Sequence, residues 1–248
     1  MKEDAHTHAS EHDNPYDWIT PDYRLKWTSD LEQLRGDHRL ATSGNALSWI
    51  KKGYVTKQFV GDAIQVLDIG CGWGRNLAQL EGAVGVDIDW ALLRTAQTYV
   101  GNPLVTADCY RLPFRDGAFD AVVMTEVIEH LDNPEGVLSE VRRVLSDRGR
   151  FVITTPNRAV TRFASVPGHM KEFYFRELSS LLKSVGFEVL ARSGSTIPYP
   201  PRYHPLTRRL DRNPFVFRLW KLIDLLLSPS KSLKWDLIVL ARPQSSGR

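Results

Sequence analysis

The sequence predicts an α/β fold in which a mainly parallel sheet is covered by helices on both faces. Strand-like apolar runs alternate with helix-like segments from Val66 to Ser193, as βαβ units with right-handed crossovers require. The first run, Val66–Ile69, stops at a glycine cluster, and the next, Val84–Asp87, ends in an acid. Together these features predict one domain organised around the turn that follows the first strand.

The composition is that of an ordinary globular protein. The chain has 248 residues, of which 42% are hydrophobic and 25% charged, and its formal net charge is +3. This length suits one α/β domain with additions, and the small net charge gives no sign of nucleic-acid binding. Two cysteines fit neither a disulfide framework nor a structural zinc site, and no run has the length of a signal peptide or membrane span. We therefore expect a cytoplasmic protein.

The chain divides into five segments. Residues 1–14 are polar and predict a disordered tail, and residues 15–62 are rich in aromatics and predict an N-terminal helical cap with a helix over 43–59. Residues 63–195 form the predicted α/β core. Residues 196–234 are too long for a plain loop and predict a helical insertion, and residues 235–248 hold the last strand and a tail.

The individual elements follow from apolar runs and helix signals. Strands are predicted at Val66–Ile69, Val84–Asp87, Leu104–Ala107, Ala121–Thr125, Phe151–Thr155, Glu188–Ser193 and Trp235–Ala241. Helices are predicted at Arg75–Glu81, Trp90–Tyr99, Pro134–Leu145 and Phe175–Val185. The helix from Pro134 has the clearest signals, because Asn133 can cap it and proline suits its first turn.

The glycine turn indicates a ligand site. Gly70, Gly72 and Gly74 lack Cβ atoms, so the backbone can turn sharply and a ligand can lie directly against it. A glycine turn alone is common, but Asp87 ends the next strand, where an acid can accept hydrogen bonds from both hydroxyls of a ribose. The pair predicts a nucleoside ligand.

Four stretches carry a resemblance to a known family. VLDIGCGWGRN, VGVDID, TADCYRLPFRDGAFDAVVMTEVIEHL and VLSEVRRVLSDRGRFVITTPN resemble the class I S-adenosylmethionine (SAM) dependent methyltransferases, most of all the small-molecule branch with quinone-biosynthesis O-methyltransferases. The resemblance implies a Rossmann-like, doubly wound sheet of seven strands. In that sheet the last strand is antiparallel and lies between the two strands that precede it in the sequence.

The resemblance also implies how SAM is bound. The glycine turn would lie against its methionine part, Asp87 would hold the ribose, and Ile88 would pack on the adenine. Asp108 would accept a hydrogen bond from the adenine amino group. The full set expected to bind the cofactor is Asp68, Gly70, Cys71, Gly72, Gly74, Asp87, Ile88, Asp108, Cys109 and Glu126.

The sequence EVIEHL predicts a second group of functional residues. If the chain turns helical there, Glu126, Glu129 and His130 share one face at spacings i, i+3 and i+4. Two carboxylates and an imidazole suit a divalent cation such as Mg²⁺, Mn²⁺ or Zn²⁺. The spacing resembles metal-dependent small-RNA 2′-O-methyltransferases, in which a second histidine follows, here His169.

Catalysis without a metal remains open at this point. Either His130 or His169 could be the general base, because a free imidazole is suited to accept a hydroxyl proton at neutral pH, and Glu126 is a further candidate for a catalytic role. All three residues also have purely structural interpretations, in which they orient neighbouring loops.

We therefore expect a SAM-dependent methyltransferase that acts on a hydroxyl oxygen of a small or lipid-like acceptor. One alternative is a metal-assisted RNA 2′-O-methyltransferase, and another is a non-catalytic partner subunit that binds SAM. Nucleic acid is not expected as a partner. The apolar and basic segment 214–227 of the insertion predicts a peripheral membrane contact, a homodimer contact or a lid over the acceptor.

Overall fold

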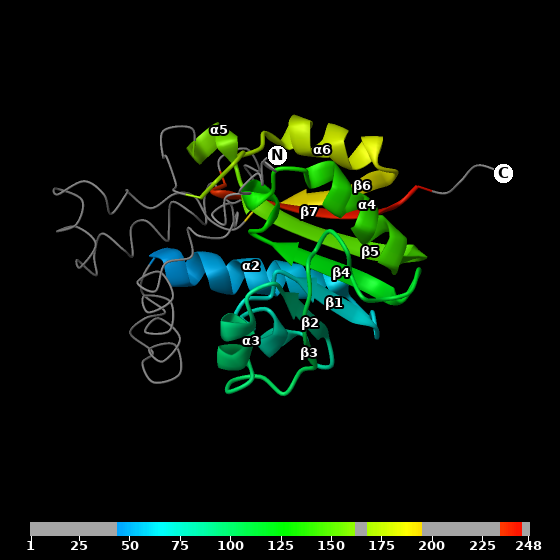
Figure 1. Ribbon diagram of the computed structural model, residues 1–248. Helices are drawn as coiled ribbons and strands as arrows, with labels where there is room; N and C mark the ends of the chain where they lie inside the picture. The colour runs from blue at the N-terminus through cyan, green and yellow to red at the C-terminus, as the bar shows by residue number, and fades with distance from the viewer. Residues whose placement is uncertain (1–43, 162–167, 195–233, 245–248) are drawn as a thin grey trace, which may run out of the picture. The chain divides into compact units, whose positions relative to one another are not determined.

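The computed structural model describes residues 44–161, 168–194 and 234–244, with side chains from residue 52 onward (Figure 1). Within these ranges, seven strands form one sheet in the order β3-β2-β1-β4-β5-β7-β6. Strands β1 to β5 are parallel, whereas β7 is antiparallel to both of its neighbours. The last strand therefore lies between the two before it, which confirms the predicted fold class.

All seven predicted strands form, and their bounds agree within two residues except for β5, which begins six residues earlier than predicted. They are β1 (Val66–Ile69), β2 (Val84–Asp87), β3 (Leu104–Thr106), β4 (Phe119–Thr125), β5 (Leu145–Pro156), β6 (Phe187–Ser193) and β7 (Asp236–Pro243). The helices are α2 (Gly44–Val60), α3 (Trp90–Ala96), α4 (Pro134–Val144), α5 (Arg158–Thr161) and α6 (Phe175–Ser184), with 3-10 turns η2 (Leu77–Gln79) and η3 (Ile128–His130).

Two hydrophobic clusters cover the two faces of the sheet, because successive strand residues point to opposite faces. On one face Val122 and Met124 of β4 pack with residues of α4 and α6. On the other face Ala121 and Val123 pack with Val60 of α2 and with residues of η2 and α3. Figure 1 shows α4 and α6 together on one side of the sheet, away from α2 and α3.

Helix α4 begins as its sequence predicts. The Asn133 side chain accepts a hydrogen bond from the Gly136 N–H at 3.0 Å, and Pro134 occupies the first turn. The face of the helix that bears Val137, Leu138 and Val141 is fully buried. Burial of a leucine or valine contributes about 1.5–3 kcal/mol to the free energy of unfolding, so this face anchors the helix to β4 and β5.

Two helix predictions were too long. Instead of a helix over Arg75–Glu81, only the short η2 forms, because the segment lies between Gly74 and Gly82, both with positive φ, and Asn76 makes no cap hydrogen bond. The helix predicted to reach Tyr99 ends at Ala96 and continues in tighter i to i−3 hydrogen bonds.

Several predictions fall outside the described residues. These are the tail 1–14, most of the N-terminal cap, and the insertion with its segment 214–227. The helix predicted over 43–59 does form, as α2. None of the helices in the part of the chain that the structure describes is long and apolar enough to cross a membrane.

Candidate functional site: the carboxyl edge of the sheet

The glycine turn follows β1 at the edge where the parallel strands end. Gly70, Gly72 and Gly74 have φ values of 68°, 53° and 87°, a region that residues with a Cβ rarely adopt. A Cβ on Gly70 would overlap the Val127 side chain, so the turn and the loop after β4 are closely packed. A Cβ on Gly72 would meet no described atom within 4 Å. At Gly72 the turn thus presents bare backbone to a space that no described atom fills within 4 Å of a Cβ.

Asp68 lies beneath this turn and is fully buried. The Asn76 side chain is its hydrogen-bonding neighbour, and its carboxylate oxygens have no other partner within the described ranges. Burial raises the pKa of Asp68 to about 7, the Asn76 side chain opposes the rise, and the charge of Asp87 adds to it. Burying an ionised carboxylate is costly, and the raised pKa means that Asp68 holds a proton more readily here than in water.

Asp87 ends β2 beside the turn, as predicted. One carboxylate oxygen accepts a hydrogen bond from the Gly72 N–H at 2.8 Å, and the other accepts from the Asp89 N–H at 2.9 Å. Each oxygen has two lone pairs, so both can still accept a hydrogen bond from a ribose hydroxyl. Burial raises the pKa of Asp87, while the N–H groups of Asp89 and Gly72 lower it. Ile88 beside it is 38% exposed, as a surface for an adenine ring would be.

Asp108 and Cys109 follow β3, the strand next to β2. The Ala107 N–H donates to the Asp87 carbonyl oxygen at 3.1 Å, so the ends of these two strands are joined. Asp108 accepts a hydrogen bond from the Tyr110 N–H at 2.9 Å with one oxygen, in a local turn. Burial raises the pKa of Cys109 to about 12 and that of Cys71 still further, so both thiols stay protonated.

Glu126 follows β4 and differs from its prediction. It has a φ of 56° and precedes a 3-10 turn, so Glu126, Glu129 and His130 do not share one α-helical face. Its Oε1 receives the Lys52 ammonium at 3.0 Å and a hydrogen bond from the Thr154 hydroxyl at 2.8 Å. Burial raises the pKa of Glu126, and the charge of Lys52 opposes this rise.

Glu129, His130 and His169 form a second cluster, in which one possible ligand atom of each residue lies within 4.8 Å of the others. The His130 Nδ1 lies 2.7 Å from the Gly168 carbonyl oxygen, which can only accept, so Nδ1 donates and the lone pair of the neutral ring is on Nε2. Burial lowers the pKa of His130 to about 4, and this ring is therefore neutral at pH 7. The His169 Nδ1 lies 3.0 Å from a Glu172 carboxylate oxygen, so its lone pair is also on Nε2 when the ring is neutral.

Strand β5 explains why Glu126 is separated from this cluster. Thr154 and Thr155 are consecutive residues of β5, so their side chains point to opposite faces of the sheet. The Thr154 hydroxyl donates to Glu126, and the Thr155 hydroxyl donates to Glu129 at 2.9 Å. The four residues predicted as one metal site therefore divide into a trio on one face and Glu126 on the face of α2.

Several residues at this edge were missed by sequence reasoning. Asp236 carried a signal, because it is a charged residue at the start of an otherwise apolar strand. Glu172 and Lys52 carried none, since an acid in a loop or a lysine in a helix is ordinary. Their partners come from residues far away in the sequence.

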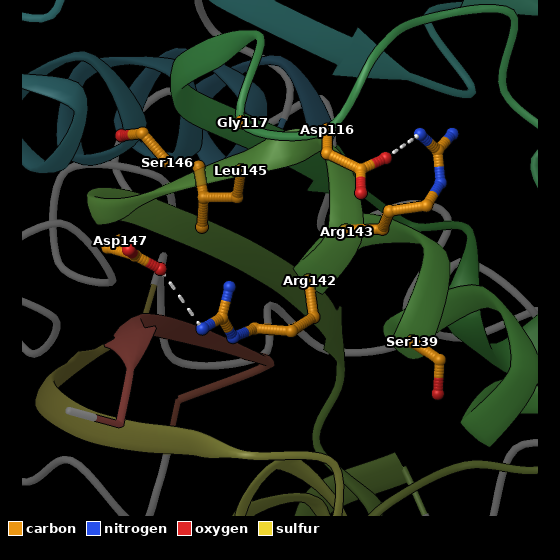
Figure 2. Close-up of a pocket in the computed structure, with 8 residues that line it drawn as sticks. All are labelled: Asp116, Gly117, Ser139, Arg142, Arg143, Leu145, Ser146 and Asp147. Carbon is orange, nitrogen blue, oxygen red and sulfur yellow. Dashed lines mark hydrogen bonds and ion pairs between the residues drawn. The ribbon is translucent and has the colours of Figure 1, made fainter. Parts of the chain in front are cut away.

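A pocket at the opposite edge of the sheet takes no part in this site (Figure 2). Its lining residues lie before β4, along the last turns of α4 and at the start of β5. Its two arginines are paired with acids, Arg143 with Asp116 at 2.7 Å and Arg142 with Asp147 at 3.3 Å. The residues that surround the glycine turn are therefore the functional candidates.

Known proteins are similar to this chain in sequence and in fold. The model of the methyltransferase domain family matches residues 67–153, which include the glycine turn, Asp87 and both acids of EVIEHL. A protein of Mycolicibacterium smegmatis, described as a probable S-adenosylmethionine-dependent methyltransferase, is 34% identical over 168 residues, or 63% of this chain and 65% of that protein.

The chain belongs to the class I SAM-dependent methyltransferases. An ubiquinone biosynthesis O-methyltransferase of Xanthomonas oryzae is 29% identical over 131 residues, which cover 48% of this methyltransferase and 54% of that protein. A SAM-dependent methyltransferase of Thermotoga maritima, described as a possible histamine N-methyltransferase, has the same fold with a TM-score of 0.64. It is 17% identical to this methyltransferase, and the match covers 88% of this chain and 96% of that one. The matches to both curated relatives thus span less than two thirds of their lengths.

The geometry of this methyltransferase fits SAM as its cofactor. A Cβ on Gly72 would meet no described atom within 4 Å, and Asp87 retains lone pairs beside it. Asp108 lies at the next strand end, and Ile88 provides exposed apolar surface. These are the groups that a nucleoside with an amino-acid end requires.

Proposed function

We propose that this methyltransferase acts on a hydroxyl oxygen of a small or lipid-like molecule, with His169 as general base. The observation that supports this proposal most is the pair formed by His169 and Glu172 at the edge that carries the cofactor turn. When bound, SAM supplies an electrophilic methyl group, which a nucleophilic oxygen takes in a single displacement. The similarity to an O-methyltransferase of ubiquinone biosynthesis also favours oxygen as the acceptor atom.

His169 suits the role of base better than His130. Glu172 accepts the hydrogen bond of the His169 Nδ1, which orients the ring and leaves the lone pair of Nε2 as the one that can take a proton. As the acceptor oxygen bonds to the methyl carbon, its proton passes to the His169 Nε2, and the Glu172 carboxylate stabilises the resulting imidazolium. His130, whose pKa is lowered to about 4, holds a proton poorly.

The rest of the chain aligns the two reactants. Methyl transfer needs the acceptor atom in line with the leaving sulfur and water kept away. The close packing of Val127 on Gly70 fixes the turn, and Asp87 holds the Gly72 N–H. Both contacts hold the backbone on which the methionine part would lie.

A divalent cation is a second way to activate the hydroxyl. Glu129, His130 and His169 are the residues that would hold it, and each has a further hydrogen bond, to Thr155, Gly168 and Glu172 respectively. Such bonds on the far side of a ligand are typical of metal sites. The cation would lower the pKa of a hydroxyl bound to it. Titration of Mn²⁺ or Zn²⁺ into EDTA-treated protein, with His130→Ala as a control, tests this proposal. The absence of binding heat together with unchanged activity would rule out a role for the cation.

The acceptor is best identified with labelled SAM and fractionated cell extract. We expect label in a small or lipid-soluble product, in an amount that the Asp87→Ala variant strongly reduces. Label in RNA that salt suppresses would instead favour the RNA 2′-O-methyltransferase, which the Glu129 and histidine cluster also suits. Binding of SAM with no labelled product in any fraction would favour the non-catalytic partner subunit.

We also propose a cytoplasmic location with a membrane or dimer contact through residues 214–227, which lie outside the described residues. Sedimentation with liposomes of anionic and of neutral lipid tests the membrane contact. Binding to the anionic vesicles alone is the expected result.

A further inference from the structure

Three buried charges lie on the α2 face of the site and have no role in the mechanism above. The Lys52 ammonium of α2 lies 3.0 Å from Glu126 and 3.2 Å from Asp236 at the start of β7. The side chains of Lys52 and Asp236 are 3% and 1% exposed, whereas that of Glu126 is 19% exposed. Burial disfavours the ammonium, yet the two carboxylates outweigh it, so the pKa of Lys52 lies above its ordinary value. This trio is a charged link between α2 and the edge of the sheet.

Glu126 lies level with the glycine turn. Strands β1 and β4 are parallel, with Ile69 beside Met124. The next residue after Glu126, Val127, packs on Gly70 of the turn, because a Cβ on Gly70 would overlap its side chain. Asp68 is sealed beneath the turn, but Glu126 keeps part of its side chain exposed beside it.

The two oxygens of Glu126 have different surroundings. Oε1 accepts from both Lys52 and Thr154, while Oε2 has no hydrogen bond or ion pair to a residue in the described ranges. The left-handed backbone of Glu126 costs about 1–2 kcal/mol in a residue with a Cβ, so its neighbours must hold it in place. Its N–H donates to the Thr154 carbonyl oxygen at 3.0 Å, and Lys52 fixes the other end of the residue.

The charges of the trio indicate what Oε2 would bind. Two carboxylates share the Lys52 ammonium, so the trio by itself carries one more negative charge than positive charge. The amino-acid end of SAM carries an ammonium group, and the turn is where that end would lie. A cationic N–H donor would satisfy both the open oxygen and the excess charge.

We propose that Lys52 is a positioning residue for the cofactor: it holds Glu126 so that Oε2 accepts a hydrogen bond from the ammonium group of SAM. This inference rests on the proposed methyl transfer from SAM. Lys52 itself does not touch the cofactor and acts through the Glu126 carboxylate.

The test compares two nucleosides by calorimetry on the full chain. S-adenosylhomocysteine (SAH) has the amino-acid end, and 5′-methylthioadenosine lacks it. In Lys52→Met, we expect the dissociation constant for SAH to rise by about tenfold or more, as loss of a charge-assisted hydrogen bond implies, with that for methylthioadenosine unchanged. Lys57→Met, an exposed lysine of the same helix, should bind both nucleosides as the wild type does.

Two further variants separate positioning from folding and charge balance. The double variant Lys52→Met/Asp236→Asn keeps the net charge of the trio, so it replaces Lys52→Met in the test if the single variant does not fold. We expect the same weakening of SAH binding, with binding of methylthioadenosine unchanged. Glu126→Ala should show a similar loss, and adding Lys52→Met to it should cost nothing further.

Three results would overturn the proposal. Unchanged SAH affinity in folded Lys52→Met/Asp236→Asn would mean that Lys52 only balances charge. An equal loss for both nucleosides would mean that Lys52 only supports the fold. If the wild type binds neither nucleoside, the assignment of the cofactor fails, and this inference fails with it.

Discussion

The glycine turn offers a matched pair of substitutions. Gly70→Ala and Gly72→Ala both place a Cβ on a residue with positive φ, which costs about 1–2 kcal/mol of unfolding free energy. At Gly70 the new methyl group also overlaps Val127, and overpacking adds about 1–3 kcal/mol. At Gly72 it enters space that holds no described atom. Gly70→Ala should therefore be the less stable protein by about 1–3 kcal/mol.

Ligand binding should separate the pair in a second way. The methyl group of Gly72→Ala enters the space assigned to SAM. We expect this variant to fold, but its dissociation constant for SAH should be about tenfold or more higher than that of the wild type. Urea denaturation measures the stabilities, and calorimetry measures SAH binding. Equal stabilities would contradict the packing of Val127 on Gly70, and wild-type SAH binding by Gly72→Ala would show that the space over Gly72 is not the cofactor site.

Three further predictions concern the acids and histidines of the site. Asp87→Ala should raise the dissociation constant for SAH about tenfold or more in calorimetry. The control Asp89→Ala removes the cap of α3, so it should cost about 1 kcal/mol of unfolding free energy and leave SAH binding intact. Weaker SAH binding by Asp89→Ala but not by Asp87→Ala would refute the assignment of Asp87 to the ribose. Burial raises the pKa of Asp68 to about 7 from 3.8, so the folded state holds this proton more tightly than the unfolded state does. The free energy of unfolding should therefore fall as pH rises from about 4 to about 7, by at most about 4 kcal/mol from this residue. Urea denaturation across this range should show a smaller fall for Asp68→Asn, and identical curves would contradict the burial argument. With the acceptor in hand, His169→Ala should lower kcat by about 10²–10⁴-fold and His130→Ala by much less, and comparable losses in both would favour the divalent cation over a histidine base.

The fold was largely readable from the sequence because buried parallel strands leave strong local signals. The runs at Val66–Ile69 and Val84–Asp87 have the predicted bounds, since apolar segments that end in glycine or an acid define both their type and their limits. The place of the last strand followed only from the family resemblance. The segment after Gly74 was predicted as a helix because pattern alone does not show that two glycines would adopt positive φ on either side of it.

The site was readable in its residues but not in its grouping. Asp68, Asp87 and the glycines lie together because strand ends in a parallel sheet share one edge. The grouping of Glu126 with Glu129 assumed a helix, but a left-handed residue and the alternation of Thr154 and Thr155 place the two acids on opposite faces. The contacts to Lys52 and Glu172 join segments distant in sequence, which no local pattern reports.

The most direct measurement is calorimetric titration of SAM and SAH into the folded, full-length chain. The account predicts saturable binding of both at one site per chain, with the heat abolished or strongly reduced in Gly72→Ala and Asp87→Ala. A folded wild-type protein that gives no binding heat with either nucleoside would contradict the assignment of the glycine turn as the cofactor site.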